Sequence, residues 1–151
     1  MTTRAATMAD ALSLAPRLRK SDKDTIAAIG VKPLAGLTDS LKSSDKAWSI
    51  VDDTDTPHGI FGVAKRPLPG PEWSIVWMLG TDGLTTNRIW LLRRTLVWVD
   101  RLKQMYGRIY NWEDTRNEDH IRWLKWCGFK FPGVTTTFAD PSVKFTFFYS
   151  E

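Results

Sequence analysis

His58 and Glu72 are the two side chains in this sequence best suited to act as a general base. An imidazole or a carboxylate can take a proton from an amine or a hydroxyl when its pKa lies near the working pH. His58 stands in the turn-forming run Asp-Asp-Thr-Asp-Thr-Pro-His-Gly, and Glu72 precedes an apolar run of strand length. Both are also ordinary turn residues, so the sequence alone leaves both roles open.

Other catalytic and metal-binding patterns have no match in the 151 residues. One cysteine and two histidines lack the spacing of a metal site, so we expect no bound metal. There is no Ser-His-Asp arrangement and no Walker-type phosphate loop. The single cysteine, Cys127, excludes an internal disulfide and is interpreted as a small buried hydrophobe. We expect no membrane span, and a reducing location such as the cytoplasm or the interior of a particle.

Basic and aromatic residues gather in the C-terminal half of the chain. Ten Lys or Arg side chains stand against five Asp or Glu between residues 88 and 130, and the whole chain contains eight tryptophans. Aromatic rings between cations can stack bases and hold phosphates, so nucleic-acid binding is one hypothesis. A solvated charged face with tryptophans packed in the core is the alternative. The interleaved residues are Trp112, Trp123, Trp126, Arg116, Arg122 and Lys125.

The hydrophobic pattern predicts the elements that position these side chains. Helices are predicted over 8–20, 21–29, 34–41, 87–106 and 117–126, and strands over 2–6, 48–51, 60–64, 73–79, 108–112 and 142–149. The Thr7 to Asp10 spacing resembles a helix cap, Pro16 weakens the first helix, and Asn117 caps the last one. The order predicts one α/β or α+β domain over residues 1–151, with a mixed central sheet flanked by helices.

Two predicted elements are central to this arrangement. The run Trp-Ser-Ile-Val-Trp-Met-Leu over 73–79 is nearly all apolar, which is typical of a central strand buried on both faces. The helix over 87–106 should pack on the sheet and lead to a parallel neighbouring strand at 108–112. Its predicted apolar face consists of Ile89, Leu92, Leu96, Val99, Leu102 and Tyr106.

Three segments are informative together: Arg-Ala-Ala-Thr-Met-Ala-Asp at 4–10, the strand 73–79 with the loop and long helix after it, and Asn117 with Gly128-Phe129. They resemble the GNAT superfamily of acyl-CoA-dependent N-acyltransferases. The first segment is similar to the family's first strand running into a capped helix. The strand 73–79, a glycine-containing loop and the long helix stand where the family binds the CoA pyrophosphate. Asn117 and Gly128-Phe129 have the spacing of the family's Asn and Gly-Phe without a gap. The resemblance covers nearly the whole chain in order.

The resemblance implies acetyl-CoA as the cofactor and an amine-bearing small molecule or protein as the acceptor. Backbone groups of Met78, Leu79 and Gly80 would hold the pantetheine arm, and Asn117 would help to orient the ligand. His120 could contact a ligand phosphate. The residues that would meet the pyrophosphate are Gly83, Thr85, Thr86, Asn87 and Arg88.

The sequence departs from the family at chemically important positions. Thr85 and Asn87 stand where small glycines are usual, and Asp82 stands where the family is usually basic. Leu124 occupies the place of a tyrosine that often protonates the CoA thiolate, and its side chain cannot transfer a proton. The tyrosines that could substitute for it are Tyr106, Tyr110 and Tyr149.

These departures support a further hypothesis in which the fold is kept without catalysis. The helix His-Ile-Arg-Trp-Leu-Lys-Trp-Cys-Gly-Phe and the strand 73–79 are similar to internal virion or morphogenesis proteins of short-tailed phages. That resemblance implies a phage or host protein as partner, and a location in the host cytoplasm or the virion. Exposed strand or tryptophan surface could also support a homodimer. A fold by itself does not decide between these functions.

Overall fold

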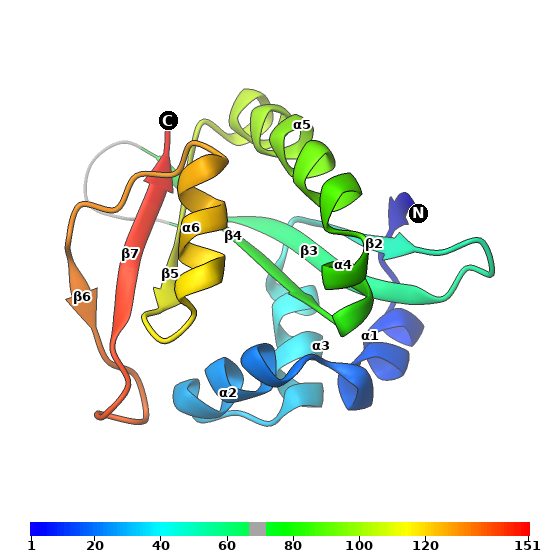
Figure 1. Cartoon of the computed structure of the whole chain (residues 1–151), viewed down its shortest axis with the longest axis horizontal. Coiled ribbons are helices and arrows are strands. Elements are labelled where there is room, and N and C mark those ends of the chain that lie inside the picture. Colours follow the sequence, from blue (N-terminus) through cyan, green and yellow to red (C-terminus); the bar gives the residue numbers. More distant parts are fainter. Residues whose placement is uncertain (67–71) are drawn as a thin grey trace.

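The computed structural model describes residues 1–66 and 72–151 (Figure 1). Within these residues seven strands form one sheet in the order β1-β2-β3-β4-β5-β7-β6. Neighbouring strands are antiparallel except β4 and β5, which are parallel, so the predicted mixed sheet is confirmed. The strands are β1 (Thr2–Ala5), β2 (Lys46–Val51), β3 (Pro57–Arg66), β4 (Trp73–Gly80), β5 (Arg108–Asp114), β6 (Thr135–Thr136) and β7 (Phe145–Ser150).

Helices cover both faces of this sheet, as predicted (Figure 1). On one face the N-terminal helices pack on β3 and β4 through a cluster that includes Leu14, Leu37 and Ile60. On the other face the two C-terminal helices pack on β3, β5 and β7 through Val99, Leu124 and Phe148. The helices are α1 (Met8–Leu14), the 3₁₀ turn η1 (Ala15–Arg17), α2 (Lys20–Ile29), α3 (Pro33–Ser43), α4 (Asp82–Thr86), α5 (Arg88–Tyr106) and α6 (Glu118–Trp126).

The first helix begins as predicted and ends earlier than predicted. The Thr7 hydroxyl accepts a hydrogen bond from the Asp10 N–H, and the Asp10 carboxylate accepts one from the Thr7 N–H, which makes a complete capping box. The predicted helix over 8–20 stops at Leu14 because Pro16 has no N–H and cannot continue the α-helical hydrogen bonds. A 3₁₀ turn and then α2 follow.

The buried face of α5 differs from the predicted one. Ile89 is 68% exposed and Leu96 is 41% exposed, whereas Leu91, Val99 and Leu102 are buried. Trp98 accounts for this rotation, because its ring packs against Trp48 and Phe61 on the sheet. Apolar residues occur nearly all round this helix, so periodicity alone did not identify the face that a large aromatic side chain selects.

β4 is central, as predicted, but the expectation that it is buried on both faces is wrong. Five consecutive residues of this eight-residue strand, from Ile75 to Leu79, are only half-buried. The cause is the short pairing with β5, which involves only Trp73, Ser74 and Ile75. The rest of β4 lines an opening in the sheet. Among the helices of the described residues, none combines the length and apolar composition needed to cross a membrane.

Candidate functional site

The opening between β4 and β5 is the main feature of the site. The two strands pair at their N-terminal ends and then diverge, as Figure 1 shows. The Asn111 side-chain amide donates a hydrogen bond to the Val76 carbonyl oxygen across the start of the opening, at 2.5 Å. Since an amide side chain takes the place of the next ladder hydrogen bond, the backbone of β4 beyond Val76 is left without a strand partner on this side.

The open edge of β4 presents the backbone N–H and C=O groups of Gly80, which are occupied, and of Met78, which are available. The Gly80 N–H donates to the Asp22 carboxylate at 2.8 Å, and the Gly80 carbonyl accepts from the Arg19 N–H at 2.9 Å. Backbone groups alternate along a strand, so Met78, between Val76 and Gly80, also directs its N–H and C=O into the opening. No described residue across the opening hydrogen-bonds to these two groups.

A cavity of about 480 Å³ fills the opening and reaches both faces of the sheet. Ile26, Ile29 and Asp39 line it on the side of α2 and α3, and Trp98 and Leu102 on the side of α5. A second hollow of about 900 Å³, here called the outer groove, lies at the N-terminal ends of α2, α4, α5 and α6. The residues that line both spaces, and so mark their junction, are Asp22, Met78, Leu91, Asn117, His120 and Trp123.

A histidine and a buried glutamate face this junction. His120, in the first turn of α6, approaches Glu113 at the end of β5, with 2.7 Å between Nδ1 and Oε2. The Asn117 amide donates to the other carboxylate oxygen at 3.1 Å. Asn117 is the N-cap residue of α6, as predicted, but its side chain makes no capping hydrogen bond. Trp123 stacks on the imidazole with 5.0 Å between ring centroids. Both carboxylate oxygens and the plane of the imidazole are therefore fixed.

Asp22 brings a second carboxylate to the junction from α2. Burial raises its pKa above the ordinary value, and the nearby Arg19 guanidinium and the hydrogen bond from the Gly80 N–H oppose that rise. The Arg19 Nε lies 2.9 Å from the Asp22 carboxylate. A positive charge on the nearby His120 ring, when the ring is protonated, would favour the ionised form of Asp22 as well. Asp22 thus ties the start of α2 to the end of β4 beside the histidine.

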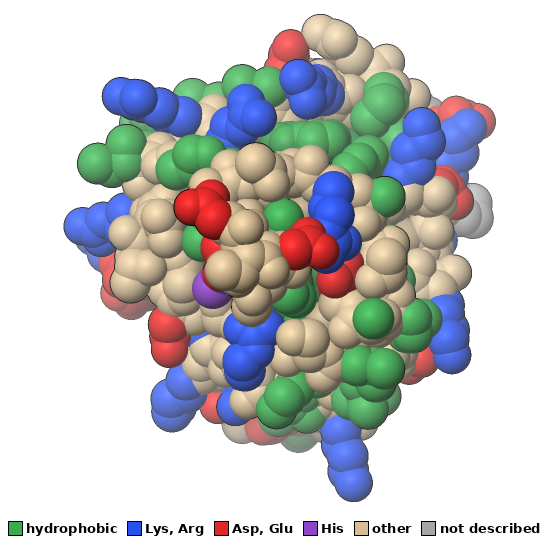
Figure 2. Space-filling view, turned by 90° about the vertical axis from the view of Figure 1, so that its right-hand side faces the viewer, with side chains coloured by type: hydrophobic (Ala, Val, Ile, Leu, Met, Phe, Trp, Pro, Cys, Tyr) green, Lys and Arg blue, Asp and Glu red, His purple; other side chains and the backbone are tan. Residues whose placement is uncertain are grey.

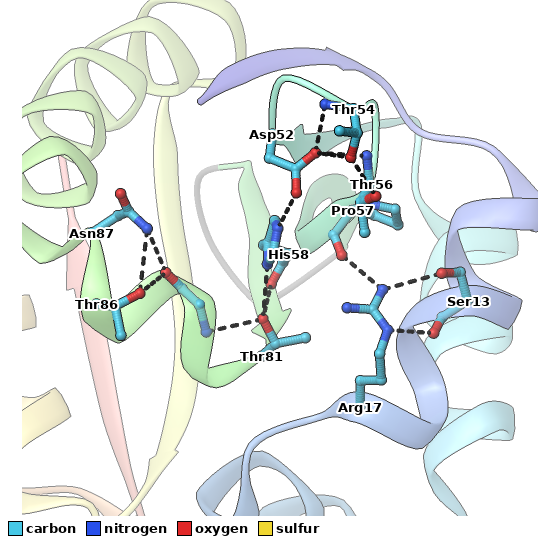
Figure 3. A network of polar contacts seen from close by, with 11 residues as sticks. Ser13, Arg17, Asp52, Thr54, Thr56, Pro57, His58, Thr81, Thr86 and Asn87 are labelled. Carbon is cyan, nitrogen blue, oxygen red and sulfur yellow. Dashed lines mark hydrogen bonds and ion pairs between the residues drawn. The ribbon is translucent and has the colours of Figure 1, made fainter.

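The predicted pyrophosphate loop is folded into a helical turn, α4. Thr85 and Arg88 line the outer groove, but Gly83, Thr86 and Asn87 line neither space. Figure 3 shows the Thr86 hydroxyl and the Asn87 amide donating to the Gly83 carbonyl, at 2.9 and 3.0 Å. This turn uses its polar groups internally. The groove is of mixed charge, with Arg19, Lys20, Arg88 and Arg116 beside Asp22, Asp82, Glu118 and Asp119.

His58 belongs to a polar network at the start of β3, away from both spaces (Figure 3). Its Nε2 lies 2.8 Å from the Asp52 carboxylate, and its Nδ1 lies 3.3 Å from the Thr81 hydroxyl. The hydrogen bond with His58 and those from Thr54 and Thr56 hold the pKa of Asp52 well below its usual range. Both ring nitrogens are thus engaged in joining the β2–β3 hairpin to the end of β4.

The other two predicted catalytic residues also lie outside the cavity and the groove. Glu72 is exposed and precedes β4, at the opposite end of the strand from Met78 and Gly80. Tyr110 is buried on β5, against Trp73 and Phe147, and burial raises its pKa. Their catalytic roles stay predictions, and the site geometry does not bring them together.

Four site residues were not predicted from the sequence: Arg19, Asp22, Asn111 and Glu113. The sequence gives a partial signal for Glu113. It precedes Asn117 by four residues and His120 by seven, and it stands near the end of β5 while the other two stand at the start of α6, so the three are close along the chain. No comparable signal exists for Asp22, which reaches Gly80 over a sequence separation of 58 residues.

Comparison with known proteins identifies the fold. No protein-family model matches the sequence, and no curated protein sequence matches it. Solved structures match over nearly the full chain. A GNAT superfamily phosphinothricin acetyltransferase from Sinorhizobium meliloti, in complex with AcCoA, gives a TM-score of 0.72 at 13% identity, with 99% of this chain and 86% of that chain covered. The chain has the GNAT fold.

Two further solved structures, both N-acetyltransferases, are similar to this chain over nearly its full length. A ribosomal-protein-alanine N-acetyltransferase from Brucella melitensis gives a TM-score of 0.71 at 14% identity and covers 99% of both chains. An N-acetyltransferase from Staphylococcus aureus gives 0.70 at 16% identity, with 99% of this chain and 97% of that chain covered. Because identities this low establish the fold alone, residue roles in this chain rest on its own geometry.

Proposed function

We propose that this GNAT-fold chain is an N-acyltransferase that moves an acyl group from a coenzyme A thioester to an amine. The observation that carries the proposal is that the Met78 N–H and C=O, on the open edge of β4, have no hydrogen-bond partner among residues 1–66 and 72–151. These groups lie at a cavity that reaches both faces of the sheet. The pantetheine arm of CoA is an extended chain with two amides. Such a chain can pair with an open strand edge as an added strand does.

The outer groove fits the phosphate end of CoA in part. Arg88 begins α5, a 19-residue helix whose N-terminus attracts anions, and it lines the groove together with Lys20. Arg19, Lys20 and Arg116 are already paired with Asp22, Asp24 and Asp114. We therefore assign phosphate binding chiefly to Arg88, which makes no ion pair with the described residues. Of the loop residues that the GNAT resemblance suggested, Thr85 is the other one that lines the groove.

The side of the cavity under α2 and α3 suits a small amine with an apolar body. Its walls include Ile26, Ile29 and the half-buried Trp77, and the Asp39 carboxylate can attract an ammonium group. An amine bound on this side and a thioester bound through β4 would approach each other through the opening in the sheet. Holding two reactants in this way is itself a large contribution to catalysis.

Two observations favour the alternative of a retained fold without catalysis. The Gly80 backbone groups, which we expected to hold pantetheine, are occupied by Asp22 and Arg19. The groove also contains Asp82, whose carboxylate would repel a pyrophosphate. In that alternative the surface of the molecule serves assembly or host binding, and no coenzyme A would bind.

Nucleic-acid binding has weaker support. Of the three tryptophans in the basic half, Trp123 stacks on His120 and Trp112 packs on Phe147, whereas Trp126 is 56% exposed. On the side of the molecule drawn in Figure 2, Lys and Arg side chains are spread among Asp and Glu side chains. A nucleic acid prefers a basic stripe over such a mixture.

Calorimetric titration with acetyl-CoA tests the proposal, together with two variants at Met78. Met78→Pro removes the N–H that faces the opening but no hydrogen bond to β3, because β4 pairs with β3 through the alternate residues. Losing one hydrogen bond of about 0.5–1.5 kcal/mol weakens binding by roughly 2- to 10-fold. The matched control Met78→Leu keeps the N–H and should bind like the wild type.

Equal affinity of Met78→Pro and Met78→Leu would contradict the assigned cofactor edge. Circular dichroism spectra of both variants check that the proline leaves the fold intact. If the wild-type chain binds no acetyl-CoA at millimolar concentration, the N-acyltransferase function is wrong and the assembly or host-binding alternative is favoured.

A further inference from the structure

We propose that His120 is the residue that takes the proton from the acceptor amine and returns it to the departing thiolate, and that Glu113 positions its ring. The proposal rests on the N-acyltransferase function proposed above. It replaces the sequence-based expectation that His120 contacts a ligand phosphate. It also differs from the predicted bases His58 and Glu72, which lie outside the cavity and the groove.

The contact with Glu113 selects one tautomer of His120. An ionised carboxylate only accepts hydrogen bonds, so the Nδ1 atom at 2.7 Å from Glu113 must carry the proton. In the neutral ring the lone pair is then on Nε2. The Asn117 amide holds the carboxylate from the other side, and Trp123 holds the plane of the ring. This arrangement orients a proton acceptor in the same way as a carboxylate orients a catalytic histidine.

The Nε2 atom is buried and has no hydrogen-bond partner among the described residues. A buried polar atom without a partner is rare in folded proteins and needs an explanation. The His120 side chain lines both the cavity and the outer groove, at their junction. We infer that an acceptor amine bound at this junction approaches Nε2 and supplies the missing donor with its N–H.

The position of His120 on α6 explains how the chain manages without a tyrosine at Leu124. Residues four apart lie on the same face of a helix, and side chains lean toward its N-terminus. His120 precedes Leu124 by four residues on α6, and both line the cavity. Hence the His120 imidazole can return the proton to the CoA thiolate, which is the role that the resemblance gives to a tyrosine at position 124.

Charged groups of both signs surround the His120 ring. Two carboxylates face the junction, Glu113 from β5 and Asp22 from α2, and Arg19 pairs with Asp22. The other charged groups that line the two spaces are Asp39 from α3, Arg66 from β3, Arg94 from α5, Lys20, Asp82, Arg88, Arg116, Glu118 and Asp119. A nearby carboxylate stabilises the imidazolium that forms during transfer.

The proposed step is balanced in atoms and charge. The neutral amine nitrogen bonds to the acyl carbon while its N–H proton passes to Nε2. The carbon–sulfur bond then breaks, the sulfur leaves as a thiolate, and the proton on Nε2 moves to that sulfur. The products are an amide and a free thiol, and the imidazole ends neutral with its proton on Nδ1.

Nuclear magnetic resonance of the histidine ring nitrogens tests the geometry without any substrate. The chain has only two histidines, and their contacts predict opposite neutral tautomers. His120 should be the Nδ1–H form, whereas His58 should be the Nε2–H form because its Nε2 faces Asp52. The Glu113→Gln variant should populate the Nε2–H form at His120 and leave His58 unchanged. An Nε2–H form at His120 in the wild type would overturn the assignment.

Steady-state kinetics on a panel of small amines test the chemistry. His120→Ala should lower kcat/KM by about 100-fold or more, as expected for loss of a general base. Its calorimetric affinity for acetyl-CoA should stay within about 2-fold of the wild type, and added imidazole should restore part of the turnover. The control Lys125→Gln changes a charge on the same helix, outside both spaces, and should match the wild type.

The outcomes separate this proposal from the proposed function. Transfer by His120→Ala at the wild-type rate, or a loss of turnover that imidazole does not restore, overturns the role of His120 while acyl transfer by the chain stands. Failure of the wild-type chain to bind acetyl-CoA overturns the acyltransferase function, and the proton-transfer role falls with it.

Discussion

Replacing Asp10 by Asn should reduce the free energy of unfolding by about 2 kcal/mol near neutral pH and by far less near pH 2. Asp10 joins β1, α1 and β2, and it is only 5% exposed. Its carboxylate accepts hydrogen bonds from the Arg4 guanidinium at 2.7 and 2.9 Å, from the Ser49 hydroxyl at 2.7 Å and from the Thr7 N–H at 3.0 Å. The substitution keeps the shape of the side chain and removes its charge.

The magnitude follows from the pKa of Asp10. Burial by itself raises this pKa, but the hydrogen bonds from Arg4, Ser49 and Thr7 outweigh burial and lower it from 3.8 to about 2. Each pKa unit corresponds to about 1.4 kcal/mol, so the ionised carboxylate stabilises the fold by about 2 kcal/mol. Because the pKa is lower in the folded state, this contribution is complete above about pH 4 and is lost as the pH falls toward 2.

Urea denaturation of the wild type and Asp10→Asn at pH 6, 3 and 2 measures this contribution. The difference in unfolding free energy should be about 2 kcal/mol at pH 6, roughly half of that at pH 3, and less than about 0.5 kcal/mol at pH 2. Asp53→Asn is the control, because Asp53 is exposed and makes no hydrogen bond or ion pair with the described residues. A difference that is the same at all three pH values would refute the electrostatic reasoning.

Two further predictions concern packing. Gly83→Ala should reduce the free energy of unfolding by about 1–3 kcal/mol in thermal unfolding, because a Cβ at this position collides with the His58 ring. The control Thr85→Ala changes an exposed residue of the same turn and should reduce the free energy of unfolding much less. Equal effects of the two substitutions would contradict the predicted collision. Cys127 should react with a thiol reagent at pH 8 roughly 100-fold more slowly in the native chain than in urea, because burial raises its pKa to about 11, and fast native labelling would show the thiol to be accessible.

Much of the fold could be predicted from local sequence. The Thr7 to Asp10 capping box is a contact between near neighbours, so its residues alone predict the start of α1. The apolar run of β4 and the helix after it likewise predict a parallel β5 beside β4, which the parallel pairing of the two strands confirms. These signals depend on near neighbours in the sequence or on the period of a single element, and tertiary contacts do not change the structure that they predict.

Other expectations failed where a tertiary contact competed with a local preference. Asn117 is the N-cap residue of α6, as predicted, but its side chain makes no capping hydrogen bond and its amide donates to Glu113. The apolar residues of α5 allow more than one buried face, and the position of Trp98 against Phe61 decides between them. β4 has the composition of a fully buried strand, yet its divergence from β5 leaves it half-buried.

The candidate site illustrates the same division. Local sequence was sufficient to predict the order of the elements, the capping box of α1, and the neighbouring positions of Asn117 and His120 at the start of a short helix, because each depends on residues within a few positions. The contact of Asp22 with Gly80 and the place of His120 beside the cavity depend on tertiary contacts. The same is true of the Met78 N–H and C=O and of the His120 Nε2, which have no hydrogen-bond partner in the part of the chain that the structure describes. The physical reason is that the cavity exists only where two strands distant in sequence diverge, and no local pattern encodes that divergence.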